Sequence, residues 1–308
     1  MAARLILVVN AGSTSLKLSL VDGDRATPVE SITSVAADAV AHRIVHGGER
    51  FRAPVVVDDA VVAGLEALVE LAPLHNAPAL AALREARAAL PAVPHVAVFD
   101  TAFHATLPDV AAAYAVPPSL GIRRYGFHGL AVQSVADQVP VGRLVVCHLG
   151  GGCSVSAVLD GRSVETSMGF TPLEGVPMAT RSGSVDPGAV LYLVRAHGAD
   201  EVGRVLEHES GLLGVSGVSG DVRELEDDPR GDFALELLCY RVAQAVAACA
   251  VALGGVDVVA FSGGIGEHSG RVRDGVVRLL GFLAPFEARI VEAREDLVAA
   301  AEARRVLG

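Results

Sequence analysis

The feature that most constrains the fold is a pattern of strand, turn and strand that occurs twice. Residues 4–23 read RLILVVNAGSTSLKLSLVDG, and residues 143–161 read RLVVCHLGGGCSVSAVLDG. In each copy an apolar run rich in Val and Leu breaks at a turn of small residues, and a second such run ends at Asp-Gly. Apolar runs bounded by glycines are typical of buried strands, so each copy predicts a β-hairpin. The repeat indicates two related domains.

Both predicted turns combine glycine with hydroxyl side chains, which are Ser13, Thr14 and Ser15 in the first copy and Ser154 in the second. Consecutive backbone N–H groups in such turns can bind an anion such as phosphate. Glycine at a turn also needs no ligand to explain it, so an ordinary hairpin is the alternative for either copy alone. Two copies together favour phosphate binding. Lys17, the only lysine of the chain, follows the first turn and indicates a need for an ammonium there.

Composition narrows the class of protein. A chain of 308 residues is long enough for two domains, and a net charge of -11 argues against general affinity for nucleic acid or anionic membranes. No uninterrupted apolar run reaches the ~18 residues of a membrane span, and no signal peptide is evident. We therefore expect a cytoplasmic protein with no nucleic-acid or membrane partner. The four cysteines have no metal-ligand spacing.

Four polar residues stand where side chains commonly meet a ligand. Arg43 ends a short strand before a Gly-Gly turn, although a solvated surface charge is the usual role of such an arginine. Asp100 follows a buried strand directly, where α/β proteins place working groups, and a cap on the next turn is the competing explanation. His128 lies between two glycines ahead of a helix. Arg181 is centred in the long aperiodic stretch 166–187, whose apolar residues argue for order and hence for function.

The remaining pattern predicts scaffold elements. We expect residues 209–223 to be irregular, because they are rich in Gly and Ser, and residues 256–269 to be a buried strand that runs into a Gly-rich turn and a helix. The predicted helices are 58–71 with Asp58 as N-cap, 78–90 with His75 and Asn76 in the loop before it, 186–197, 200–209, and 232–253, whose nearly all-apolar end from Val242 should be buried.

Together these motifs resemble the acetate kinase family, which belongs to the superfamily of actin, sugar kinases and heat-shock ATPases. The matching segments follow the order of the family from residue 8 to about residue 270. They are NAGSTSLK, HRIVHGGE, LAPLHN, VFDTAFH, YGFHG, HLGGG, TSMGFTPLEG, TRSG, ESGLLGVSG and GGIGE.

The resemblance implies an α/β fold of two ribonuclease H-like domains of the actin-like ATPase superfamily, with the active site in the cleft between them. The N-terminal domain would comprise residues 1–103 plus 294–308, and the nucleotide-binding domain residues 104–293. The implied activity is reversible, Mg²⁺-dependent, direct in-line transfer of the γ-phosphoryl group of ATP to acetate. This gives acetyl phosphate and ADP. Similar proteins are usually homodimers.

The resemblance also implies roles for individual residues. Acetate is ionised at pH 7 and needs no base, so Asp100 would orient an arginine or the water shell of the metal. The implied catalytic residues are Asn10, Arg43, Asp100, His128 and Arg181. The implied ATP contacts are Ser13, Ser15, Lys17, His148, Gly150, Gly152, Asp221, Val222, Arg223, Gly264, Ile265 and Gly266. Arg43, Val45, Leu74, Phe127 and Pro172 would contact acetate, and Asn10 and Glu295 would serve the metal.

Three departures from the family pattern leave alternatives open. Gly151 and His268 stand where the family usually has asparagine, and the chain is shorter than the family norm by roughly a quarter. Residues 292–300 resemble a compressed final strand and acidic turn that would carry Glu295. Local propensity instead predicts one helix over 287–306 with Glu295 on its surface. The alternative functions are a propionate or short-chain carboxylate kinase and a catalytically impaired nucleotide-binding relative. A sugar kinase is disfavoured, because no polar set for a polyhydroxylated substrate is evident.

Overall fold

The computed structural model describes residues 4–11, 16–69 and 73–308, and for residues 73–75 it describes the backbone alone. The chain divides into two compact units. Unit 1 comprises residues 1–105, 127–134 and 294–308, and unit 2 comprises residues 106–126 and 135–293. The predicted boundaries at residues 103 and 294 remain a prediction, but the structure groups residues 127–134 with unit 1.

Unit 1 is built on a six-stranded sheet with the order β3-β2-β1-β4-β6-β5. The first predicted hairpin is confirmed: β1 and β2 pair antiparallel, with Asn10 opposite Lys17. β4 and β6 extend the sheet parallel to β1. The strands are β1 (Leu5–Ala11), β2 (Leu16–Asp22), β3 (Arg25–Pro28), β4 (Ala39–Ile44), β5 (Val55–Val56) and β6 (His95–Phe99).

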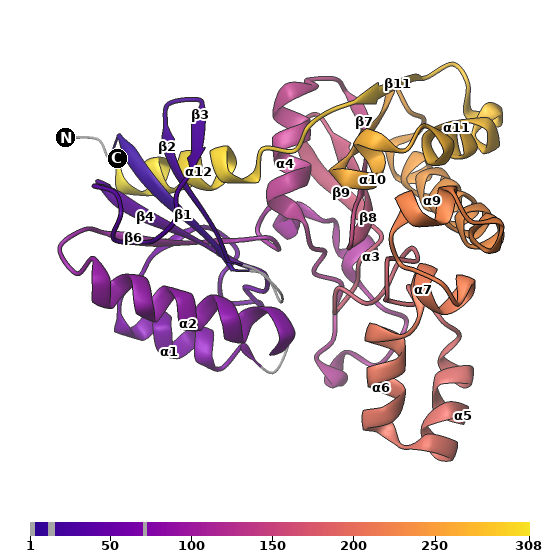
Figure 1. The fold of residues 1–308 in the computed structure, drawn as a ribbon, viewed down its shortest axis with the longest axis horizontal. Coiled ribbons are helices and arrows are strands. Elements are labelled where there is room, and N and C mark those ends of the chain that lie inside the picture. Colours follow the sequence, from indigo (N-terminus) through magenta and orange to yellow (C-terminus); the bar gives the residue numbers. More distant parts are fainter. Residues whose placement is uncertain (1–3, 12–15, 70–72) are drawn as a thin grey trace. The chain divides into compact units, whose positions relative to one another are not determined.

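Helices cover both faces of this sheet (Figure 1). Because side chains alternate along a strand, Leu7 and Val9 of β1 enter one core while Ile6 and Val8 enter the other. The first core includes Leu65, Leu80 and Leu83 from the helices below the sheet, and the second includes Leu130 and Val298. The helices are α1 (Asp59–Glu66), α2 (Pro73–Ala89), α12 (Glu295–Leu307) and the part of α4 (Gly129–Gln138) up to Ser134.

Unit 2 repeats the arrangement of unit 1, with strand order β11-β10-β7-β8-β9. β7, β8 and β9 form an antiparallel meander, and β10 and β11 extend the sheet parallel to β7. The second predicted hairpin is therefore confirmed, and so is the duplication of a ribonuclease H-like core. The strands are β7 (Arg143–Leu149), β8 (Cys153–Leu159), β9 (Arg162–Thr166), β10 (Val258–Ser262) and β11 (Glu287–Ile290).

The long helix of unit 2, α9 (Asp232–Leu253), packs against β7, β8 and β9. Its apolar sequence predicted that it would be buried. Its apolar end is not buried all round, because Val251 is 84% exposed. The helical stretch Pro229–Leu253 meets the length and composition of a membrane span when a few polar residues are allowed, but half of that window is buried inside unit 2. The helices of unit 2 are α3 (Asp109–Ala112), α5 (Pro187–His197), α6 (Ala199–His208), α7 (Gly211–Ser216), α8 (Val222–Glu226), α9 (Asp232–Leu253), α10 (Gly263–His268) and α11 (Gly270–Leu279). Short 3-10 helices lie at Phe103–Thr106 (in unit 1 through Ala105), Pro118–Leu120, Pro229–Gly231 and Gly281–Leu283.

Four predicted boundaries were wrong. The helix predicted over 58–71 ends at Glu66. The second helix begins at Pro73 rather than Pro78, so Asn76 lies within α2 rather than in a loop; proline fits the first helical position, and Pro73 takes it. The short helix α7 lies within the stretch predicted to be irregular, and α8 begins at its end, where the Asp221 carboxylate caps the Arg223 N–H. The helix predicted over 287–306 is also wrong: β11 pairs with β10 and α12 begins only at Glu295.

Candidate active site

Arg43 is the centre of a polar cluster in unit 1. β4 ends at Ile44, and its parallel neighbour β6 ends directly before Asp100, so the two strands bring these side chains to the same sheet edge. Arg43 Nε donates to Asp100 Oδ1 at 2.9 Å, and Nη2 donates to Oδ2 at 2.7 Å. Arg43 Nη1 reaches Asn10 Oδ1 at 3.1 Å and Glu295 Oε2 at 3.1 Å. The structure therefore brings together four of the residues that the sequence singled out.

The charges of this cluster are strongly coupled. The Asp100 side chain is 1% exposed, and burial raises its pKa although Arg43 opposes the shift. Burial would lower the pKa of Arg43, but Asp100 and Glu295 outweigh that effect and raise it. Both Asp100 oxygens bind one guanidinium, so its side chain orients Arg43, and a cap on the following turn does not account for it.

Glu295 takes its place because α12 begins there. The residue lies in the first turn of the helix, where the positive end of the helix dipole stabilises a carboxylate. Asn10 and Glu295 thus direct an amide oxygen and a carboxylate oxygen at the same Arg43 nitrogen. Oxygen donors of this kind fit Mg²⁺, which takes one or two protein ligands and fills its remaining positions with water and phosphate oxygens. No cluster of three or more His, Cys, Asp or Glu side chains suited to a metal occurs among the described residues.

The segment YGFHG docks beside Asp100. Gly129 donates its N–H to the Asp100 carbonyl oxygen at 3.0 Å, and a Cβ on Gly129 would lie only 2.0 Å from that oxygen, so glycine is required. A ring nitrogen of His104 lies 3.0 Å from the Phe127 carbonyl oxygen and must donate to it. His128 adopts a φ of 59°, a conformation that costs energy outside glycine and that the surrounding contacts maintain.

Two apolar residues predicted to contact acetate are buried in unit 1. Val45 and Phe127 are buried, and the Phe127 ring packs edge-on against His46 with centroids 5.3 Å apart. Asn76 fixes the strand end: its side chain accepts from the His46 N–H at 3.0 Å and donates to the His46 carbonyl at 3.0 Å. Of the other residues predicted for unit 1, Lys17 is exposed on β2, while Ser13, Ser15 and the Leu74 side chain lie outside the described residues.

In unit 2 two glycine turns lie side by side. β7 and β10 are parallel neighbours, with His148 opposite Ser262, so the turns that follow them share one sheet edge. A Cβ on Gly150 would lie 3.8 Å from the Gly264 nitrogen. The Glu267 carboxylate accepts from the Gly263 N–H at 2.9 Å and so shapes the second turn. The sequence analysis assigned Glu267 no role, although it stands inside the quoted GGIGE segment.

The Arg181 segment packs on the first of these turns. Ala179 donates its N–H to the Gly151 carbonyl at 3.2 Å. Arg181 Nη1 lies 3.2 Å from the Pro172 carbonyl oxygen and 3.7 Å from Met178 Sδ. Burial lowers the pKa of Arg181 although the charge of Glu207 opposes the shift, and among the described residues no carboxylate forms an ion pair with Arg181. This cation is therefore less compensated than Arg43.

Residues 220–223 lie against the same segment. A Cβ on Gly220 would lie 2.7 Å from the Ala179 carbonyl oxygen. Val222 is buried, while the exposed Arg223 pairs with Asp221 on its own turn. The predicted nucleotide contacts of unit 2 thus gather around the glycine turns.

Similarity to known proteins agrees with this geometry. The model of the acetokinase family matches residues 27–295. The acetate kinase of Deinococcus radiodurans is 51% identical over 267 residues, which cover 80% of this chain and 67% of that protein. The crystal structure of Porphyromonas gingivalis acetate kinase is 30% identical with a TM-score of 0.90, and the alignment covers 99% of this chain and 100% of that one. A propionate kinase from Francisella tularensis is 30% identical with a TM-score of 0.89, covering 97% and 98%. With a family match that spans most of its length and motifs that fold into the contacts described above, the chain belongs to the acetokinase family.

Proposed function

We propose that the protein is an acetate kinase, which transfers the γ-phosphoryl group of ATP to acetate and forms acetyl phosphate and ADP. The observation that carries this proposal is the Arg43 cluster, in which Asp100, Asn10 and Glu295 hold one guanidinium, in a chain of the acetokinase family. A fixed cation of this kind suits a reaction that moves negative charge.

The chemistry needs charge donors more than a base. An acetate oxygen forms a bond to the γ-phosphorus while the bond from that phosphorus to the β,γ-bridging oxygen breaks, and ADP leaves with the electron pair. Acetate is ionised at neutral pH, so no residue has to deprotonate it. Arg43, Arg181 and His128 would stabilise charge on the transferred group, and Asp100 would keep Arg43 in place.

The nucleotide would bind at the glycine turns of unit 2. Gly150, Gly152 and Gly264–Gly266 would present backbone N–H groups to phosphate oxygens, with His148 and residues 221–223 beside them. When bound, Mg²⁺ would neutralise charge on the phosphates. Asn10 and Glu295 would serve it, and Ser13, Ser15 and Lys17 would complete the phosphate contacts of the first turn. We also propose a cytoplasmic homodimer.

One assay tests this proposal. The protein is incubated with ATP, MgCl₂ and acetate, and hydroxylamine traps acetyl phosphate as the hydroxamate. We expect product with acetate, less with propionate and little with butyrate. Absence of hydroxamate at millimolar substrate, with nucleotide binding intact, would instead favour an impaired relative. A preference for propionate would favour the activity named for the Francisella tularensis structure.

A further inference from the structure

The side chain of Arg124 joins the two ends of the loop 166–174, which carries Pro172. Arg124 Nη1 donates to three consecutive carbonyl oxygens at the start of the loop, those of Thr166, Ser167 and Met168, at 3.2, 3.1 and 3.0 Å. Its Nη2 donates to Glu174 Oε1 at the end of the loop, at 2.8 Å. The two ends of a nine-residue segment are thus joined by one planar group that is only 17% exposed.

Tyr114 contacts the same loop. We call Tyr114, Arg124 and Glu174 together the clasp. The Tyr114 hydroxyl donates to the Glu174 carboxylate through a short hydrogen bond and accepts from the Phe170 N–H at 2.9 Å. The Arg124 guanidinium also lies 5.5 Å from the centroid of the Tyr114 ring. Burial, followed by the contact with Glu174, raises the pKa of Tyr114 to about 12, so the hydroxyl keeps its proton.

The loop is shaped around this clasp. A Cβ on Gly169 would lie 1.6 Å from Glu174 Oε2 and 2.1 Å from the Tyr114 hydroxyl, so the glycine of the TSMGF segment is needed by these side chains. The Gly169 carbonyl in turn accepts from the Tyr125 N–H at 3.0 Å. The conformation of the segment is therefore held by Tyr114 and Arg124 from outside it together with its own Glu174.

What the clasp fixes is the environment of Arg181. The Pro172 carbonyl, at the far end of the clasped loop, accepts from Arg181 Nη1 at 3.2 Å. Because no carboxylate holds Arg181 among the described residues, this carbonyl is a main determinant of where its charge points. A loop that moved would carry the carbonyl with it.

We propose that Tyr114, Arg124 and Glu174 are positioning residues that set Pro172 and the Arg181 guanidinium for catalysis and for acetate selection. This inference rests on the proposed acetate kinase function. The clasp residues do not touch the reacting atoms. They act by holding the loop, because displacing a charge donor by about 1 Å can cost ~100-fold in rate.

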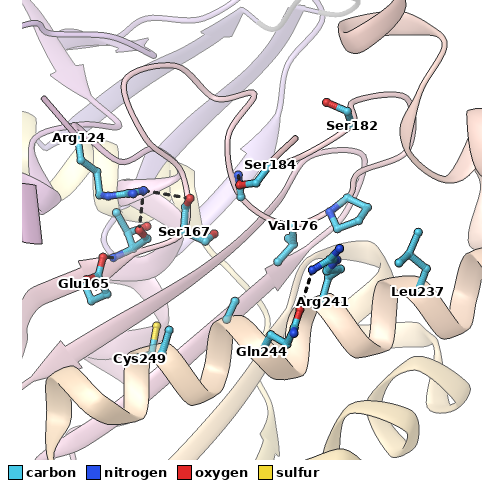
Figure 2. A pocket seen from close by; sticks show the side chains of 15 residues that line it. Arg124, Glu165, Ser167, Val176, Ser182, Ser184, Leu237, Arg241, Gln244 and Cys249 are labelled. Atoms are coloured by element: carbon cyan, nitrogen blue, oxygen red, sulfur yellow. Dashed lines mark hydrogen bonds between the residues drawn. The ribbon is translucent and has the colours of Figure 1, made fainter. Parts of the chain in front are cut away.

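The chain offers a matched control on the same cavity. Arg124 lines a cavity of about 530 Å³ together with Arg241 of α9 (Figure 2). Arg241 donates to Gln244 on its own helix at 3.0 Å, and among the described residues it makes no hydrogen bond to the clasped loop. Arg124→Lys and Arg241→Lys therefore make the same chemical change on one cavity, inside and outside the clasp. Lysine cannot reproduce a planar fork that reaches both ends of the loop.

The test compares steady-state constants of the whole protein for acetate and ATP. For Arg124→Lys we expect kcat/KM for acetate to fall ~10- to 100-fold, with KM for ATP within about twofold of the wild type. Tyr114→Phe, which keeps the ring and removes one hydroxyl, should cost ~5-fold in the same constant. Arg241→Lys should match the wild type. If the clasp were only structural, Arg124→Lys would lower Tm and active fraction while the constants of the active enzyme stayed unchanged, and the proposal would be overturned.

Hydrogen exchange separates this inference from the proposed function. Wild type that forms no acetyl phosphate would refute the function, yet exchange of loop amides needs no substrate. We expect faster exchange of the Phe170 amide in Tyr114→Phe and of the amides of residues 168–171, 173 and 174 in Arg124→Lys, and no change in Arg241→Lys. Unchanged exchange in both clasp variants would refute the clasp whatever the enzyme assay gives.

Discussion

Two arginines that the sequence placed in the same reaction have opposite surroundings. Arg43 lies on a strand end and binds Asp100, Glu295 and Asn10, so its positive charge is fully compensated. Arg181 lies in an irregular segment, touches a carbonyl and a sulfur atom, and has no carboxylate partner among the described residues. Burial lowers the pKa of Arg181, whereas the carboxylates raise that of Arg43.

The difference teaches that an arginine side chain can be kept in place in two ways. Arg43 is held by opposite charge, which fixes its geometry but stabilises it without any substrate. Arg181 is held by the backbone shape of its loop, which leaves its charge available to an anion. Removal of the two arginines should therefore differ in its effect on stability and be alike in its effect on turnover.

The largest effect is expected on stability. Arg43→Ala leaves Asp100 buried without its partner, so we expect the free energy of unfolding to fall by about 3–5 kcal/mol. Arg181→Ala removes a hydrogen bond to a neutral carbonyl and should cost about 1 kcal/mol. Urea denaturation of both variants measures the contrast. The double variant Arg43→Leu, Asp100→Asn should regain part of the loss, and equal losses for the two arginines would remove the distinction between them.

On turnover the two arginines should be alike. Each →Ala variant should lower kcat at least ~100-fold, the scale of one lost charge donor. The hydroxamate assay measures this, with Arg84→Ala as the control, since Arg84 is exposed and pairs with Glu66 on helices of unit 1. Near-normal turnover in either variant would exclude that arginine from the site.

Acid should lower the stability of unit 1 through His42, which precedes Arg43 on β4. His42 is buried beside His95, with ring nitrogens 2.9 Å apart, and burial lowers its pKa from 6.5 to about 3. In the unfolded chain His42 takes up a proton near pH 6.5, whereas in the folded chain it stays neutral down to about pH 3. The contribution of neutral His42 to stability is therefore complete above pH 6.5 and is lost as the pH falls toward 3. We expect a loss of about 1.4 kcal/mol per pH unit from this residue between those values.

Denaturation midpoints from pH 7 to pH 4 test this expectation. His42→Gln should flatten the slope, whereas the exposed His208→Gln should not. The Arg181 segment, residues 167–186, contains no histidine and so contributes no such slope. Identical pH profiles for wild type and His42→Gln would contradict the assignment.

Acetate selection should depend on Val45, which follows the strand of Arg43 and is buried. One methylene in an apolar pocket is worth about 1–3 kcal/mol, so Val45→Ala should move the ratio of kcat/KM for propionate over acetate up by ~10-fold. Steady-state constants for acetate, propionate and butyrate measure it. A wild-type preference for butyrate would show that Val45 does not limit the size of the acetate pocket.

The smallest effect concerns Gly151 in the Arg181 region. Gly151 is exposed, and a Cβ there would meet no atom within 4 Å, so a side chain fits. Gly151→Asn would restore the residue usual in the family and should raise kcat/KM for ATP ~5-fold, the worth of one hydrogen bond. Gly151→Ala adds the Cβ alone and should change nothing. If the two variants behave alike, the amide has no role.

Much of the site could be predicted from sequence because its residues follow short, regular elements. Asp100 comes directly after β6 and Arg43 is the penultimate residue of β4, so local pattern places each near a strand end, and the parallel pairing of the two strands then brings them to one sheet edge. The repeated pattern likewise predicted one hairpin in each sheet. Sequence failed where the outcome depends on distant partners. The hydrogen bonds between the Asn76 side chain and the backbone of His46, thirty residues away along the chain, are not visible in the local pattern.

The sequence by itself determined the two hairpins, the strand ends that carry Arg43 and Asp100, and the membership of the family, because alternating apolar runs and fixed motifs are local properties. Only the tertiary structure decided that Glu295 faces Arg43. Local propensity favours one helix over residues 287–306, but strand pairing with β10 draws residues 287–290 into the sheet and delays the helix to Glu295. The same holds for the clasp on the 166–174 loop: Tyr114, Arg124 and Glu174 are dispersed over sixty residues, and only folding brings their hydrogen-bonding groups together.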